Sequence, residues 1–170
     1  MVNRKIYFNN DFISLAEYLP VDDVDSYSDL LDIDTQKGYN YIFSQSFLEF
    51  SKEEVKQRFY ASIILNQNKV LIGSIGVSQL NSIPDLAIRL FKPYRMQGYG
   101  TMAFRLGTKY AVEELKIKEL HAECYPDNIG SIKMLQKCGF VPYPDGNQKE
   151  KHFITCEDIT QLDFIYCVID

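Results

Sequence analysis

Two glycines separated by one residue, Gly98 and Gly100, lie between a short alternating apolar run and a long amphipathic one. The run over residues 85–91 alternates large apolar side chains with others, which predicts a strand. Residues 101–116 place apolar side chains at helical spacing, which predicts a helix with one broad apolar face. The glycines permit positive φ and expose backbone N–H groups where that helix begins. This segment predicts an anion site in an α/β domain, although a plain strand-to-helix turn also fits it.

The rest of the chain alternates short apolar runs with helical patterns. Strands are expected over residues 6–8, 62–65, 69–77, 120–125, 151–155 and 163–169, with a further one starting at residue 140. Helices are expected over residues 11–19, in the acidic segment 22–34, over 51–59 and over 128–138. Strands outnumber helices and hairpins occur near both ends, so the pattern indicates a mixed α/β domain. The length of 170 residues fits a single domain over residues 1–170.

Composition narrows the possible partners and the compartment. Eighteen Lys and Arg against 23 Asp and Glu leave a net charge of -5, so we expect no nucleic-acid partner. No apolar run is long enough to span a membrane, and the first ten residues carry no signal-peptide pattern. The cysteines match no metal-binding spacing, so we expect reduced thiols, no metal and a cytoplasmic protein. These cysteines are Cys124, Cys138, Cys156 and Cys167.

The glycine pair also overlaps a dinucleotide-binding fingerprint, because Gly98-x-Gly100-x-x-Ala103 follows the G-x-G-x-x-A pattern. This overlap makes an NAD-dependent oxidoreductase an alternative function. Two features argue against it. Residues 92–97 separate the glycines from the predicted strand, and some ninety residues of hairpin and helix precede the motif. A P-loop is excluded because no Gly-Lys-Ser/Thr follows.

Two ordered motifs resemble those of the GNAT N-acetyltransferases. The segment RMQGYG at residues 95–100 resembles the family's R/Q-x-x-G-x-G/A acetyl-CoA motif. After a predicted strand, NIGSIKMLQKCGF at residues 128–140 resembles the family's N-x-x-S…K-x-G-F segment. The acidic first third and residues 41–58 are similar to the RimJ/RimL-like branch, less specifically. The resemblance implies a central mixed, mostly antiparallel sheet of about seven strands flanked by helices.

The resemblance also implies an acetyl-CoA site. The loop backbone would hold the diphosphate, and the main chain near Leu90 and Phe91 would pair with the pantetheine arm. A backbone N–H near Phe91 would stabilise the oxyanion. Asn128 would hydrogen-bond the arm, with Ser131 nearby, although an N-cap role for Asn128 is equally expected. The implied cofactor-binding residues are Leu90, Phe91, Arg95, Met96, Gln97, Gly98, Tyr99, Gly100, Thr101, Asn128 and Ser131.

The implied reaction is direct transfer of an acetyl group from acetyl-CoA to a primary amine in a ternary complex, by a monomer or homodimer. Such a reaction needs a base for the amine. Asp85 stands near the start of the strand before the loop, where many family members carry Glu, but it also fits a strand-end residue. Glu123 and His121 share one face of the next strand and are alternative bases. Both also fit solvent-facing strand residues.

The general acid and the acceptor are less constrained. Leu135 stands where many family members carry a Tyr, and Met102 where close relatives often carry Glu. Tyr125, Tyr143, Tyr166 or water are possible substitutes, and a non-catalytic CoA-binding or regulatory domain is a further alternative. The acceptor could be a protein N-terminus, a polyamine or another small amine. The acidic residues 22–34 could attract such a cation, although a charge run is usually a solvated helix face.

Overall fold

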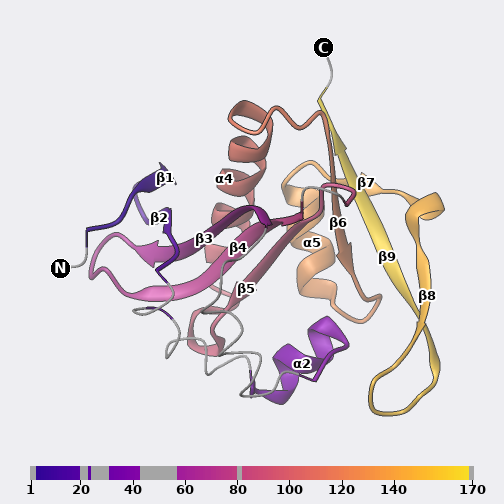
Figure 1. The fold of residues 1–170 in the computed structure, drawn as a ribbon. Coiled ribbons are helices and arrows are strands. Elements are labelled where there is room, and N and C mark those ends of the chain that lie inside the picture. The colour runs from indigo at the N-terminus through magenta and orange to yellow at the C-terminus, as the bar shows by residue number, and fades with distance from the viewer. Residues whose placement is uncertain (1–2, 20–22, 24–30, 43–56, 80–81, 169–170) are drawn as a thin grey trace.

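The computed structural model describes residues 3–19, 23, 31–42, 57–79 and 82–168 (Figure 1). Within these residues the chain forms nine strands in two sheets. The first sheet has the order β1 (Ile6–Asn9), β2 (Ile13–Glu17), β3 (Gln57–Leu65), β4 (Leu71–Gln79) and β5 (Leu86–Leu90), all antiparallel. In the second, β9 (Asp158–Cys167) pairs antiparallel with β6 (Glu119–Cys124), β7 (Val141–Pro142) and β8 (Gln148–Lys151).

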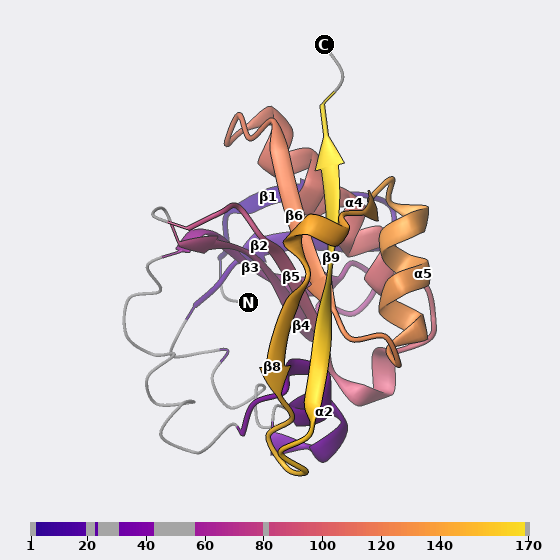
Figure 2. The same cartoon turned by 90° about the vertical axis from the view of Figure 1, so that its right-hand side faces the viewer.

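Helices flank these sheets. The long helix α4 (Tyr99–Glu113) connects β5 to β6, and α5 (Ile129–Lys137) connects β6 to β7. Both lie on the same side of the molecule, whereas the short helix α2 (Ile33–Tyr39) lies at the lower end of both views (Figures 1 and 2). Two 3-10 turns, Lys92–Tyr94 and Pro144–Gly146, complete the described elements. The expected mixed α/β fold with mostly antiparallel pairing and flanking helices is therefore confirmed.

The core lies between α4 and the first sheet. Ala103, Phe104 and Ala111 of α4 are fully or almost fully buried. A Cβ on Gly107 would lie 2.6 Å from Cδ1 of Ile75, so this glycine lets the helix approach β4 closely. The Phe140 ring packs on Phe104 with a centroid distance of 5.3 Å. Phe140 is thus a core residue, and α4 is fixed by packing rather than by its polar N-terminus.

The two sheets meet at β5 and β6, which run parallel. Asp85 and His121 form an isolated bridge there, and the backbone N–H of His121 donates to the Pro84 carbonyl at 2.8 Å. Along the described lengths of β5 and β6 no ladder continues beyond this bridge. The strands therefore diverge toward their carboxyl ends, which creates a split in the middle of the protein.

The first expected helix, over residues 11–19, is wrong because this stretch forms β2. Four consecutive residues, Ile13 to Ala16, are buried, so both faces of β2 are covered. A strand buried on both faces lacks the alternation that identifies a strand in a sequence. The Asn10 Oδ1 accepts from the N–H groups of Phe12 and Ile13 at 2.8 and 2.9 Å, which produces a turn with the composition of a helix cap.

Other boundaries also differ from expectation. The helix expected over residues 51–59 is wrong at its end, since β3 begins at Gln57, and residues 51–56 lie outside the described residues. Most of the acidic helix over residues 22–34 also lies outside them. The strand expected over 151–155 is instead β8, which ends at Lys151, because His152 Nδ1 accepts from the N–H groups of Ile154 and Thr155 in a turn.

Candidate active site

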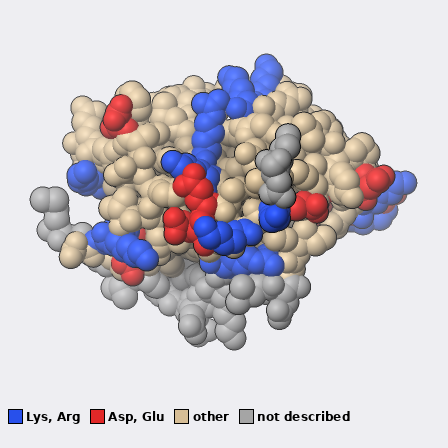
Figure 3. All heavy atoms as spheres, turned by 90° about the horizontal axis from the view of Figure 1, so that it is seen from above, with Lys and Arg blue, Asp and Glu red and all other residues tan. Residues whose placement is uncertain are grey.

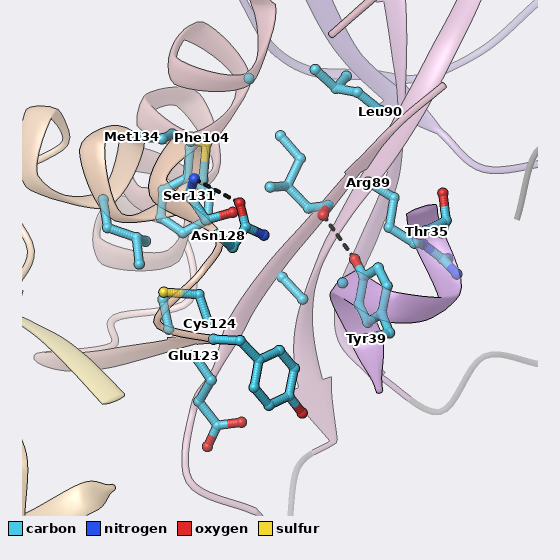
Figure 4. A pocket seen from close by; sticks show the side chains of 18 of the residues that line it. Thr35, Tyr39, Arg89, Leu90, Phe104, Glu123, Cys124, Asn128, Ser131 and Met134 are labelled. Atoms are coloured by element: carbon cyan, nitrogen blue, oxygen red, sulfur yellow. Dashed lines mark hydrogen bonds between the residues drawn. The ribbon is translucent and has the colours of Figure 1, made fainter. Parts of the chain in front are cut away.

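A cavity of about 610 Å³ occupies the split between β5 and β6 (Figure 4). One wall is β5, the other is formed by β6 and the start of α5, and α2 closes a third side. In Figure 4, Asn128 and Ser131 face Tyr39 and Arg89 across this space, while Glu123 lies toward the end away from Leu90. Segments as far apart in sequence as Asp34 and Gln161 therefore contribute to one cavity.

The glycine loop presents the open N-terminus of α4. Gly98 is the N-cap with φ of 88°, and no side chain caps the helix there. Met96 also has a positive φ, 59°, and its side chain is 93% exposed. The helix begins at Tyr99, two residues earlier than expected, so Gly100 and Thr101 belong to its first turn. Uncapped first-turn N–H groups with the positive end of the helix dipole are suited to an anion such as a phosphate.

The Arg95 side chain turns away from this helix end. Its Nε donates to the Leu90 carbonyl at 2.8 Å, and a terminal nitrogen donates to Thr35 Oγ1 at 2.6 Å. The same nitrogen lies 3.3 Å from Asp32 Oδ2. Burial acts to raise the pKa of Asp32, but the Thr35 hydrogen bonds and the Arg95 charge outweigh it and lower that pKa. Arg95 therefore fixes the loop to α2. The backbone N–H groups of the loop, rather than this side chain, are available to an anion.

The backbone of β5 alternates between the sheet and the split. The Phe91 N–H donates to the Ile72 carbonyl at 2.9 Å, and the Ser78 N–H donates to the Asp85 carbonyl at 2.9 Å. Odd-numbered residues thus pair with β4, and the backbone groups of Ile88 and Leu90 face the split. The Phe91 N–H itself is held within the sheet and its side chain is buried, so an oxyanion donor near Phe91 would have to be a neighbouring N–H that faces the split.

Side chains from α2 and the loop cover two of these carbonyls. The Tyr39 hydroxyl donates to the Ile88 carbonyl at 2.7 Å (Figure 4), as Arg95 does to the Leu90 carbonyl. Burial raises the pKa of Tyr39 to about 12, so its hydroxyl stays protonated and remains a donor. The aromatic run at residues 39–43 predicts either a lining of the acceptor pocket or simple packing, and Tyr39 does line the cavity, whereas sequence reasoning missed Thr35. Asp32 as an N-cap and Asn40 as a C-cap were the available signals for α2.

Asn128 and Ser131 lie together on the opposite wall. The Asn128 Oδ1 accepts from the Ser131 N–H at 3.1 Å, which confirms the expected N-cap of α5. Figure 4 shows both side chains directed into the cavity. Leu135, which replaces the family Tyr, is 2% exposed and also lines the cavity.

Of the three tyrosines proposed as substitutes for it, only Tyr125 is among the cavity-lining residues. Burial, followed by the hydrogen bond and charge of Glu150, raises the pKa of Tyr125, and its hydroxyl donates to Glu150. Tyr143 instead packs against His121, and Tyr166 against Phe140.

Asp85 and Glu123 both line the cavity. Burial, then the charges of Glu123 and Asp163, raises the pKa of Asp85 to about 7, while His121 acts in the opposite direction. The Asp85 Oδ1 is buried and has no hydrogen-bond partner among the described residues. Glu123 is exposed, as its solvent-facing alternative predicts, and partial burial followed by the charges of Asp163 and Glu150 raises its pKa. A carboxyl group that titrates near neutral pH can accept a proton from a substrate.

His121 lies beside the cavity without lining it. Its Nδ1 is 2.7 Å from Asp163 Oδ2, and its Nε2 is 3.2 Å from Glu119 Oε1. The residue is 6% exposed, so the expectation of a solvent-facing His121 is wrong. The cause is β9, which pairs with β6 and places Asp163 opposite Glu123. Burial acts against the imidazolium, but the bonds and charges of Asp163 and Glu119 raise the pKa of His121 overall.

Other features of the described residues bear on function. No group of three or more His, Cys, Asp or Glu side chains in them could hold a metal ion. None of their helices is long and apolar enough to cross a membrane. Seen from above, basic and acidic side chains are interspersed on the face shown (Figure 3). Ala103, the last residue of the dinucleotide-like pattern, is fully buried, and the antiparallel sheets lack the parallel framework that such a site requires.

The chain has a split between two antiparallel sheets and an uncapped helix end beside it. We compared the sequence with models of known protein families to find which family has these features. A family model described as "Acetyltransferase (GNAT) domain" matches residues 9–141. The match covers most of the 170 residues, and the chain therefore belongs to this acetyltransferase family. It is 31% identical over 91 residues to the "Probable N-acetyltransferase YjcK" of Bacillus subtilis (strain 168). That similarity spans 51% of this chain and only 50% of the length of that relative.

Solved structures share the fold at low sequence identity. An acetyltransferase (GNAT family) from Bacillus anthracis has a TM-score of 0.78 and 18% identity, covering 94% of this chain and 96% of the other. A spermidine N-acetyltransferase from Vibrio cholerae, in complex with CoA and spermine, has a TM-score of 0.72 and 15% identity. It covers 91% of this chain and 94% of its own. These similarities establish the GNAT fold of the chain.

Proposed function

We propose that this chain is an acetyl-CoA-dependent N-acetyltransferase that acts on a primary amine by direct transfer in a ternary complex. One observation carries the proposal. A single cavity joins the uncapped N-terminus of α4 to Asp85, a buried carboxyl group that titrates near neutral pH. The first group suits an anion, and the second suits an amine that must lose a proton.

The residues of the cavity fit acetyl-CoA. The backbone from Arg95 to Thr101 would hold the diphosphate, with the exposed Met96 and Gln97 at the rim. The split-facing edge of β5 at Ile88 and Leu90 would pair with the pantetheine arm, opposite Asn128 and Ser131. Asp85 lies five residues before Leu90, roughly 16 Å along an extended strand. An elongated ligand held at α4 would thus reach toward Asp85.

Three groups of this chain would serve the transfer, for which acetyl-CoA supplies an activated thioester. Asp85 would accept the proton of the amine, directly or through water, and Glu123 would add negative charge that favours a cationic acceptor. The N–H of Ile88 or Leu90 would donate to the thioester carbonyl oxygen, because only even-numbered residues of β5 face the split. We assign His121 no direct contact with substrate, since it does not line the cavity.

The leaving thiolate must also be protonated, and no cavity side chain considered above is suited to that role. Leu135 offers no proton, and Tyr125 holds its own proton tightly against Glu150. Water entering the open side of the cavity would serve in their place. The same observation favours a second candidate function, a CoA-binding regulatory domain without catalysis.

The acceptor would be a protein N-terminus, a polyamine or another small amine, as in the RimJ/RimL-like branch. The proposal includes a cytoplasmic monomer or homodimer without nucleic-acid or membrane partners. The four cysteines are unpaired, with Cys124 and Cys138 buried, as expected in a reducing compartment.

Thermal unfolding and turnover together test this function. A cosubstrate present at a hundredfold excess over its Kd should stabilise the protein by about 2.7 kcal/mol, so acetyl-CoA should raise Tm and NAD should not. Thiol release should then follow on at least one member of a panel of N-terminal peptides, polyamines and small amines. Stabilisation without release across the panel would favour the regulatory function, and no stabilisation by acetyl-CoA would overturn both.

A further inference from the structure

Behind the cavity wall, three ionisable side chains meet where β5, β6 and β9 come together. Asp85 and His121 are paired by the parallel bridge, and Asp163 binds His121 at 2.7 Å. His121 and Asp163 are 6% and 5% exposed. Only Asp85 of the three lines the cavity. The pair His121–Asp163 is therefore screened from substrate but adjoins the proposed base.

Two buried oxygens distinguish this cluster from an ordinary structural ion pair. Among the described residues, Asp85 Oδ1 and Asp163 Oδ1 are buried without a hydrogen-bond partner. Buried carboxylate oxygens are normally satisfied, because an unpaired one loses its hydration without replacement. Two such oxygens beside one imidazole indicate that the cluster sets the charge of its own carboxyl groups at some cost in stability.

Charged and titratable groups face Asp85 from each surrounding element. His121 and Glu123 belong to β6, Asp163 to β9, and Tyr39 to α2. From β4, Ser78 contributes a neutral hydroxyl that accepts from the Asp85 N–H at 2.9 Å. His121 is thus the one basic side chain among these groups, and Asp163 holds it in place.

We propose that the buried His121–Asp163 pair is a positioning element of the active site, which fixes the charge that Asp85 carries when the acceptor amine arrives. This inference rests on the proposed role of Asp85 as the base. His121 favours the ionised Asp85 carboxylate, whereas Asp163 opposes it. The two members of one hydrogen-bonded pair therefore act on Asp85 with opposite signs.

Substitution of each member should move the pH dependence in opposite directions. With saturating acetyl-CoA, D163N introduced into H121Q should shift the acidic limb of the kcat/KM profile for the amine to lower pH by about one unit relative to H121Q, because without the imidazole Asp163 acts on Asp85 by its charge alone. H121Q should shift it to higher pH by a similar amount. Loss of packing alone would lower the rate at every pH without moving the limb.

An activity-independent measurement accompanies the kinetics. NMR titration of carboxyl-labelled Asp, with the Asp85 signal assigned by its loss in D85N, should show the same opposite shifts. D158N is the matched control, because Asp158 is an exposed carboxylate on β9 that pairs with Lys151, and it should shift neither profile. E119Q is a further variant, at a position where the natural Glu119 side chain is 64% exposed. It should move the limb in the direction of H121Q but less, since Glu119 supports the imidazolium.

Two results would overturn the inference. An Asp85 signal that titrates identically in H121Q/D163N, H121Q and the natural protein would show that the pair does not act on it. If the signal shifts but the rate profile does not, Asp85 is not the base, and the failure lies with the proposed function on which the catalytic role of the pair depends.

Discussion

Gly98 and Gly100 are required for different reasons. Gly98 has a φ of 88°, a conformation that costs other residues roughly 1–2 kcal/mol. Gly100 is helical, and a Cβ there would make ordinary contacts, at 3.4 Å from Met134 Sδ and 3.5 Å from Leu90 Cδ1. Since glycine destabilises a helix by about 1 kcal/mol relative to alanine, the fold alone does not explain Gly100. Under the proposed function, its missing side chain would let the diphosphate approach the backbone closely.

The substitution G100A should separate stability from binding. We expect Tm to rise by about 2 °C, from improved helix propensity, and KM for acetyl-CoA to rise severalfold, because a methyl group enters the diphosphate site. G38A is the comparison, since Gly38 is also helical and lines the same cavity from α2 rather than from α4, and a Cβ there meets nothing within 4 Å. It should raise Tm without changing KM for acetyl-CoA. An unchanged KM in G100A would remove the diphosphate from this helix end.

At the level of elements, α2 connects the two halves of the split. Toward β5 it contributes the Tyr39 hydroxyl on the Ile88 carbonyl and the Thr35 contact with Arg95. Toward the β8–β9 hairpin it uses Asn40, whose amide donates to the Lys151 carbonyl and accepts from the Phe153 N–H, both at 2.8 Å. A seven-residue helix is marginal by itself, so these contacts hold it in place across the cavity.

The Asn40 contacts give a testable prediction. N40A loses both hydrogen bonds and places Ala at a φ of 50°, so the free energy of unfolding should fall by roughly 1–3 kcal/mol. We expect KM for the acceptor to rise more than KM for acetyl-CoA, since Asn40 lies at the opposite end of α2 from the Thr35 contact with Arg95 of the glycine loop. N40G keeps the backbone conformation and loses only the bonds. Equal changes in both KM values would contradict this placement of α2.

The elements that sequence could predict are those with a strong local pattern. The predicted strand at 85–91, helix at 101–116, strand at 120–125 and Asn128-capped helix all have counterparts in β5, α4, β6 and α5. Local pattern failed at β2, because burial on both faces removes its alternation. It also failed at α2, whose seven residues are held by contacts with Arg95, Lys151 and Phe153 rather than by their own periodicity.

The sequence could predict which residues belong to the site, but not their surroundings or orientation. The glycine loop and Asp85 follow from motif and position, but the environment of Asp85 depends on Asp163, which is 78 residues away and reaches it only through the pairing of β6 with β9. The orientation of Leu90 and Phe91 depends on the register between β4 and β5. A shift of one residue in that register would exchange their roles, and nothing in the local sequence fixes it.

For the whole molecule, the buried acidic cluster makes stability depend on pH. The pKa of Asp85 is about 7 in the folded protein and about 4 in an unfolded chain, so the folded state binds more protons between these values. The free energy of unfolding should therefore fall as pH rises from about 4 to 7. The raised pKa of His121 acts in the same direction, because its contribution is lost as pH rises through the folded value. The lowered pKa of Asp32 affects only more acidic solutions.

Removal of the Asp85 charge should restore the free energy of unfolding that is lost when this buried group ionises. D85N should be more stable than the natural protein at pH 8, by about 2–4 kcal/mol, and equally stable at pH 4. Urea unfolding at the two pH values measures the difference, with D158N as a control that changes little at either. The stabilised variant should also lose turnover. Equal stabilities of D85N and the natural protein at pH 8 would show that the carboxyl group is not strained by its surroundings.

The unpaired side of β5 has a consequence for the protein before any ligand binds. A strand whose main-chain groups await a partner is also a template on which another polypeptide can assemble, as in fibrils and domain-swapped dimers. Here the strand lies inside the molecule, and the Tyr39 hydroxyl and the Arg95 guanidinium occupy its Ile88 and Leu90 carbonyls. These two side chains thus leave the carbonyls unavailable to a second polypeptide, and a ligand that pairs with the same carbonyls, as proposed for the pantetheine arm, would have to displace them.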